Sequence, residues 1–131
     1  MDKLLFSLLI TAMLSGCDSK NTEQMEFSNE NICRATIATT LHKKLSSIEV
    51  DKKVRDITYL YYIRKNDGSR WEYKCKVLKK DILWGMADGR WRDGKYDDPM
   101  SFTISNGKLN IAKTYYDNSI LENSYSKMDF N

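Results

Sequence analysis

Side chains that could support catalysis or bind a metal are few and scattered in this chain of 131 residues. His42 is the only histidine, and it precedes Lys43 and Lys44, where a solvated histidine on a helix is expected. No Gly-x-Ser-x-Gly turn or Ser-x-x-Lys pattern is present, so nucleophilic catalysis is not indicated. Four acids are interleaved with cations at a spacing that fits no calcium loop, namely Asp88, Asp93, Asp97 and Asp98. The sequence thus predicts no catalytic residue, no metal and no cofactor.

The N-terminus carries the pattern of an export signal. Residues 4–14 form an apolar run that is too short to cross a hydrocarbon core of ~30 Å as a stable helix. The run closes on Leu14-Ser15-Gly16-Cys17, in which small residues precede a cysteine. This segment resembles the signal of bacterial lipoproteins, which implies removal of residues 1–16, acylation of Cys17 and attachment to a lipid bilayer. The alternative is an ordinary secretory signal in which Cys17 is incidental.

The resemblance to lipoproteins also implies a location and a domain organisation. The mature protein is expected in the bacterial cell envelope, anchored by lipid and facing the periplasm. An aspartate after the acylated cysteine favours inner-membrane retention in enteric members of the class, and Asp18 has this position, although the outer membrane stays open. We expect a flexible tether over residues 17–27 and a single domain over residues 28–131.

Two cysteines remain once Cys17 is assigned to lipid. In an exported protein, Cys33 and Cys75 are most simply explained by a disulfide. Such a bond would close a loop of about 43 residues and stabilise the fold by up to ~4 kcal/mol. A metal pair or a catalytic thiol is the alternative, but no second ligand pair lies nearby.

A helix is predicted to begin after Ser28, which can cap it. The apolar residues that follow recur at intervals of three or four and define one buried stripe: Cys33, Ile37, Leu41, Leu45 and Ile48. Threonines within this segment lower its helix propensity, so packing must supply the stability.

After residue 53 the apolar period changes to two, which predicts strands over residues 57–63, 71–77 and 82–86. A three-residue loop over 66–68 would oppose Ile63 to Trp71 and bring Tyr59, Tyr61 and Cys75 onto the inner face. Trp71 and Trp84 are then expected in the core.

The second half of the domain contains the strongest turn signal, Asn106-Gly107. It predicts a hairpin that opposes Ile104 to Leu109 and Phe102 to Ile111, and residues 120–128 add a possible edge strand. The predicted fold class is α+β: one N-terminal helix packed on a four- to five-stranded antiparallel meander, with a helix–sheet disulfide.

Two groups of residues are candidates for binding a partner. The first is the outward face of the first hairpin in the predicted register, made of Leu60, Tyr62, Arg64, Lys74 and Lys76. The second is the loop segment Arg90, Trp91 and Arg92, with Trp91 as an exposed anchor or as a lid over the open end of the sheet. The alternative for the first group is a solvated sheet face whose lysine stems shield the apolar residues.

The mature domain resembles small uncharacterised bacterial and prophage-encoded envelope lipoproteins. The matching pieces are Cys33-Arg34-Ala35-Thr36-Ile37-Ala38-Thr39, Trp71-Glu72-Tyr73-Lys74-Cys75 and Gly89-Arg90-Trp91-Arg92. This resemblance implies an envelope location and the cysteine pair, and no mechanism. The net charge of +3 is modest, and nucleic acid is absent from the expected compartment, so we expect no nucleic-acid binding.

These observations favour a lipid-anchored periplasmic binding module that engages an envelope protein as an inhibitor, an exclusion factor or an assembly (pilot) lipoprotein. We expect it to be a monomeric domain without enzyme activity. Alternatives are a carrier or sensor of a small ligand held between helix and sheet, an enzyme that acts on glycan through the acids of residues 88–98, or an envelope spacer.

Overall fold

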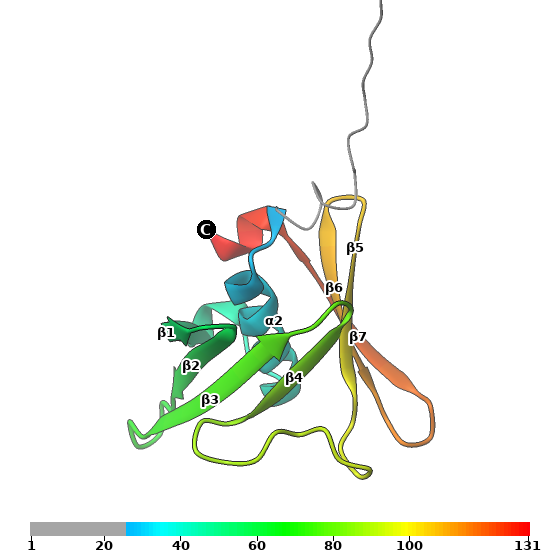
Figure 1. Ribbon diagram of the computed structural model, residues 1–131. Coiled ribbons are helices and arrows are strands. Elements are labelled where there is room, and N and C mark those ends of the chain that lie inside the picture. Colours follow the sequence, from blue (N-terminus) through cyan, green and yellow to red (C-terminus); the bar gives the residue numbers. More distant parts are fainter. Residues whose placement is uncertain (1–25) are drawn as a thin grey trace, which may run out of the picture.

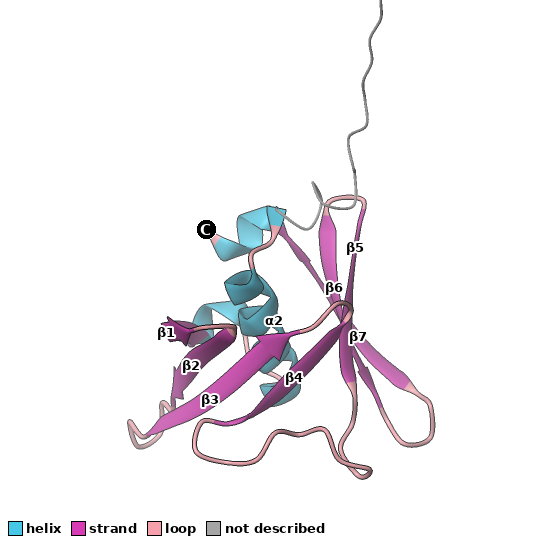
Figure 2. Ribbon diagram, viewed as in Figure 1, coloured by secondary structure: helices cyan, strands magenta, loops and turns pink. Residues whose placement is uncertain are grey.

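The computed structural model describes residues 26–131, so the predicted signal, Cys17 and Asp18 lie outside the described residues. Helix α2 lies against one face of an antiparallel sheet whose seven strands are ordered as in the chain (Figures 1 and 2). The elements are α2 (Asn29–Leu41), η1 (Leu45–Ser47), β1 (Ile48–Val54), β2 (Ile57–Ile63), β3 (Arg70–Val77), β4 (Asp81–Met86), β5 (Met100–Ser105), β6 (Lys108–Thr114), β7 (Ile120–Ser126) and η2 (Lys127–Phe130). The α+β class is confirmed, but the sheet has seven strands rather than four or five. Within residues 26–131, no helix is long and apolar enough to span a membrane.

The start of α2 follows the prediction. The Asn31 N–H donates to the Ser28 hydroxyl at 3.1 Å, and the Ser28 N–H donates to the Asn31 side chain at 3.3 Å. Phe27, expected in the tether, is instead buried and packs edge-on against Phe130 with ring centroids 5.8 Å apart. The folded part therefore begins before Ser28, and η2 lies beside the first turn of the helix (Figure 1).

The end of α2 differs from the prediction, because the helix stops before the apolar stripe does. His42 adopts a left-handed conformation with φ 55°, and the Lys43 N–H donates to the Ala38 carbonyl at 2.9 Å. This closing turn satisfies carbonyls of the last helical turn and ends the helix. Leu45 then lies in η1 and Ile48 opens β1, so three successive elements bury apolar residues against one core.

The predicted disulfide between Cys33 and Cys75 is confirmed, with Cα atoms 5.8 Å apart. It joins the middle of α2 to the inner face of β3, and both cysteines are fully buried. Two threonines of the helix are buried as well and are satisfied by hydrogen bonds. Thr36 donates to the Ile32 carbonyl at 2.8 Å, and the Thr39 hydroxyl lies 3.1 Å from the Tyr125 hydroxyl.

The register of β2 and β3 is shifted by one residue from the prediction. Ile63 pairs with Arg70, not with Trp71, because the connecting loop spans six residues, 64–69. The Arg64 N–H donates to the Ser69 carbonyl at 2.8 Å and closes that loop. A shift of one residue exchanges the two faces of a strand. The inner face therefore carries the pairs Thr58–Cys75, Leu60–Tyr73 and Tyr62–Trp71.

The remaining strands include one confirmed hairpin and one strand that the sequence did not predict. The hairpin at Asn106-Gly107 has the predicted pairs, Ile104 with Leu109 and Phe102 with Ile111. The unpredicted strand is β1, which pairs with β2. Between β4 and β5 only two residue pairs form, so the sheet splays there and residues 87–99 bridge the two strands.

Removal of the disulfide tests whether it holds the helix to the sheet. We expect the double substitution Cys33→Ala/Cys75→Ala to lower the free energy of unfolding by about 2–5 kcal/mol, because the unfolded chain gains conformational freedom. Urea unfolding followed by circular dichroism measures this change. Wild-type protein unfolded with a reductant should show a similar loss, and unchanged stability of both samples would contradict the structural role.

Candidate interaction surfaces

The shifted register separates the residues predicted to form one binding face. Leu60 is only 1% exposed and Tyr62 is partly buried, and both lie on the face that packs against α2. Lys74 and Lys76 alternate with the buried Cys75, so they lie on the opposite face. The predicted combination of Leu60 and Tyr62 with the two lysines is therefore wrong.

Arg64 and Trp71 also have surroundings other than those predicted. The Arg64 guanidinium lies 5.6 Å from the centroid of the Trp71 ring and 3.6 Å from the Asp67 carboxylate. It therefore stabilises the β2–β3 loop and does not extend a row on the outer face. Trp71 is 40% exposed beside the β2–β3 loop, where its ring N–H donates to the Ser69 hydroxyl at 3.0 Å, whereas Trp84 packs against the core as predicted.

The outer face of the sheet, away from α2, carries tyrosines opposite charged residues. Tyr59 pairs with Lys74, and Tyr61 pairs with Glu72. The Arg70 guanidinium lies 3.8 Å from the centroid of the Tyr61 ring and forms ion pairs with Asp51 at 3.5 Å and Glu72 at 2.7 Å. The hydrogen bond to Glu72 raises the pKa of Arg70. The charge of Arg70 is thus already compensated by the carboxylates of Asp51 and Glu72.

Residues 87–99 place Trp91 on the same outer face. The Arg92 N–H donates to the Trp84 carbonyl at 2.8 Å, so the segment runs along the edge of β4 that β5 leaves unpaired. Gly85 permits this approach, because a Cβ at that position would collide with the Arg90 carbonyl oxygen. The Lys74 ammonium donates to the Gly89 carbonyl at 2.6 Å and ties the segment to β3.

Four residues then form one group, which we call the outer cluster: Tyr59, Lys74, Lys76 and Trp91. The ammonium groups of Lys74 and Lys76 lie 4.5 and 5.5 Å from the centroid of the Trp91 ring. Neither lysine forms an ion pair with a carboxylate of residues 26–131. Trp91 is partly buried on this face beside the two ammonium groups, and its role as an anchor or as a lid stays a prediction.

Arg90 and Arg92, also predicted to bind a partner, are engaged within their own loop. Arg90 makes a two-pronged hydrogen bond to Asp97 at 2.8 and 3.1 Å, and Asp97 also accepts the Gly94 N–H at 2.8 Å. The Arg92 guanidinium lies 5.5 Å from the centroid of the Trp84 ring and 3.8 Å from Asp97. Both arginines therefore help to close the loop, and their role in binding a partner stays a prediction.

The acids of this loop do not converge on one point of the surface. Asp97 is bound by the arginines, and Asp98 lies 3.8 Å from the Lys113 ammonium. His42 is exposed at the end of α2. Within residues 26–131, no group of three or more histidine, cysteine or acidic side chains is placed to hold a metal ion.

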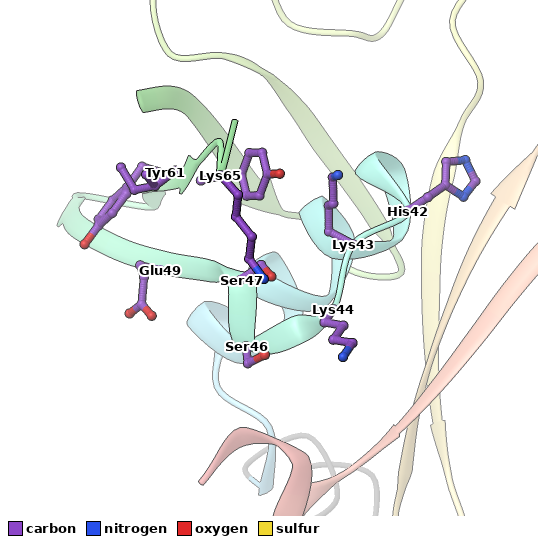
Figure 3. A pocket seen from close by; sticks show the side chains of 10 residues that line it. His42, Lys43, Lys44, Ser46, Ser47, Glu49, Tyr61 and Lys65 are labelled. Atoms are coloured by element: carbon purple, nitrogen blue, oxygen red, sulfur yellow. The ribbon is translucent and has the colours of Figure 1, made fainter. Parts of the chain in front are cut away.

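A second group, which sequence reasoning missed, surrounds a surface hollow of about 670 Å³ at the C-terminal end of α2. We call it the basic hollow, and Figure 3 shows the side chains that line it. They are His42, Lys43, Lys44, Ser46, Ser47, Glu49, Tyr61, Tyr62, Ile63 and Lys65. The sequence signal was the run Lys43-Lys44, but only the fold brings Lys65 to the same place.

No family model, curated protein or solved structure matches this chain.

The ion pairs of Asp97 make the stability of the loop dependent on pH. Hydrogen bonds from Arg90 and from the Gly94 N–H hold the pKa of Asp97 at about 2, below its ordinary value of 3.8. Because the pKa is lower in the folded state, the stabilisation is complete above pH 3.8 and is lost as the pH falls through about 2. We expect Asp97→Asn to lower Tm at pH 7, and the difference from wild type to shrink toward zero at pH 2. Thermal melts followed by circular dichroism measure both.

Asp88→Asn is the matched control, since Asp88 is an exposed acid of the same loop without an ion pair to a described cation. The Tm of this variant at pH 7 should differ little from that of wild type. A Tm difference between Asp97→Asn and wild type that is the same at pH 7 and at pH 2 would refute the role of the Asp97 ion pairs in stability.

Proposed function

We propose that this protein is a lipid-anchored binding module of the bacterial envelope that engages an acidic surface of another envelope protein. Inhibition, exclusion and assembly (pilot) functions all belong to this class. The acylated Cys17 would hold the module at the periplasmic side of a membrane, and the outer cluster would contact the partner.

The observation that carries the proposal is the combination of aromatic rings and uncompensated cations in the outer cluster. Tyr59 and Trp91 offer large apolar surfaces, and residues of this type dominate the energetics of protein interfaces. Lys74 and Lys76 supply positive charge with no carboxylate of residues 26–131 paired to either. Because α2 packs on the other face of the sheet, no helix of the described residues covers this group.

The proposal assigns no catalytic residue. Asp97 is held by two arginines, which favour its ionised form and occupy its oxygens. We propose no acid or nucleophile as a catalytic partner of His42. Its ring points away from the other labelled side chains in Figure 3. A binding role therefore explains the arrangement of these side chains better than acid–base chemistry does.

The anchor would raise the local concentration of the module at the membrane, so that a weak interface suffices. Residues 17–26 can span at most about 36 Å when extended, which keeps the module close to the membrane surface. A partner in the same membrane layer is therefore favoured over a freely diffusing one.

The anchor is tested by the mass of the mature chain. We expect protein purified from membranes to begin at Cys17 and to carry the mass of acyl chains on that residue, measured by intact mass spectrometry. Cys17→Ser should abolish the acyl mass and release the chain from the membrane fraction. A mature chain without acyl mass would contradict the anchor, while leaving the outer cluster available for a soluble partner.

The interface is tested by photo-crosslinking of the full chain in cells. Ile57 pairs with Lys76 next to the outer cluster, so a benzoylphenylalanine at position 57 should form an adduct with the partner. Lys76→Glu should reduce this adduct at least tenfold, because it places a negative charge opposite the partner's acids. Lys76 is chosen because, unlike Lys74, it makes no hydrogen bond to the Trp91 loop.

Lys79→Glu is the matched control, since Lys79 is an exposed lysine in the turn that follows β3. It makes the same change of net charge and should leave the adduct at the wild-type level. Benzoylphenylalanine at the fully exposed Tyr116 should give no adduct with the same protein. Equal adduct yields in the Lys76→Glu and Lys79→Glu variants would exclude the outer cluster as the interface.

A further inference from the structure

The basic hollow gathers cations from two parts of the chain that are distant in sequence. Lys43 and Lys44 follow the end of α2, whereas Lys65 belongs to the loop between β2 and β3. In the view of Figure 3 the Lys65 side chain extends toward Ser47. The arrangement therefore comes from the fold and not from a single basic run.

These cations have little compensation within residues 26–131. None of the three lysines forms an ion pair with a described carboxylate, and Glu49 is the one acid among the lining residues. Like charges around one hollow repel each other and raise the local positive potential. A bound anion would remove that repulsion.

The end of the helix explains only part of this charge. The carbonyls of its last turn carry a partial negative charge, which favours a cation immediately after it. That effect accounts for Lys43, whose N–H also donates to the Ala38 carbonyl. Lys65 does not follow the helix in sequence, so the end of the helix does not account for its position at the same hollow.

The other lining groups specify what kind of anion fits. Hydroxyls of Ser46 and Ser47 can donate hydrogen bonds, and the lysine ammoniums act as point charges without a fixed direction. A tetrahedral phosphate has more acceptor oxygens, and as a monoester more charge, than a carboxylate. Tyr62 and Ile63 add apolar walls for the carbon part of an ester, although the Lys43 ammonium already lies 5.2 Å from the centroid of the Tyr62 ring.

We propose that the basic hollow binds a phosphate ester group. This site is independent of the outer cluster, since the three lysines lie outside that group. The hollow is at the C-terminal end of α2, about 20 Å along the helix from the end where the tether joins. The phosphate ester is part of a soluble molecule, of a glycan or of a lipid headgroup. A comparison of soluble ester with anionic lipid separates these sources.

The test uses the full chain in nanodiscs of neutral phosphatidylcholine, titrated with glycerol 3-phosphate and followed by backbone amide NMR. We expect saturable shifts at Lys43, Lys44, Ser46, Ser47 and Lys65, with a Kd in the millimolar range at low ionic strength. Charge screening should weaken the binding when salt is raised to about 0.5 M. Acetate should bind at least fivefold more weakly, because it carries one charge and two oxygens.

The triple substitution Lys43→Gln/Lys44→Gln/Lys65→Gln should weaken binding of glycerol 3-phosphate at least tenfold. The control Lys79→Gln/Lys80→Gln/Lys108→Gln removes the same charge from exposed lysines elsewhere and should stay within twofold of wild type. Lys65→Gln alone should weaken binding about threefold, which tests the site without changing the end of the helix. Equal weakening in both triple variants, or no saturable shift in wild type, overturns the proposal.

A second arm replaces part of the phosphatidylcholine with phosphatidylglycerol and omits the soluble ester. Shifts at the same amides identify a lipid headgroup as a source of the phosphate, and unchanged amides restrict the source to soluble or glycan-linked esters. Because the crosslinking experiment uses Ile57 and Lys76 and this one uses other residues, failure of either proposal is recognised separately.

Discussion

The burial of α2 against the inner face of the sheet is the constraint on which the rest of the structure depends. The helix is buried on most of its surface, and the disulfide between Cys33 and Cys75 fixes it to β3, the strand between β2 and β4. Even its threonines are enclosed and must find partners, as Thr39 does with Tyr125. Once this face of the sheet is committed to the helix, every alternate residue of each strand is directed to the outer face.

This constraint explains which parts of the fold the sequence predicted. Ser28 and Asn106-Gly107 are local signals, and both the cap and the hairpin they predict are present. The disulfide was predicted from the expected compartment and the cysteine count, which do not depend on register. The register of β2 and β3 did not follow, because a six-residue loop and a three-residue loop leave similar local patterns. The choice between them is made by which side chains fit beneath the helix, and that is a tertiary property.

Strand β1 and the position of Trp91 show two further limits of sequence reasoning. The turn before β2 contains Arg55 in a left-handed conformation in place of the usual glycine or asparagine, and a bulge at Asp51 interrupts the alternation of β1. Trp91 lies in a long connection whose course depends on the splay between β4 and β5. Its contact with Lys74 joins residues that no local pattern relates.

The two kinds of cation in this domain have different surroundings, and the difference bears on function. Arginines such as Arg70 and Arg90 pair with carboxylates, and Arg34 donates to the carbonyls of Leu45 and Ile48, so these guanidiniums contribute to the fold. The lysines of the outer cluster and the basic hollow instead have no paired acid among residues 26–131, and Lys43, Lys74 and Lys76 lie over aromatic rings. A folded domain gains nothing from such repulsion by itself. Anionic groups of other molecules would relieve this repulsion, which is why both surfaces are proposed to bind them.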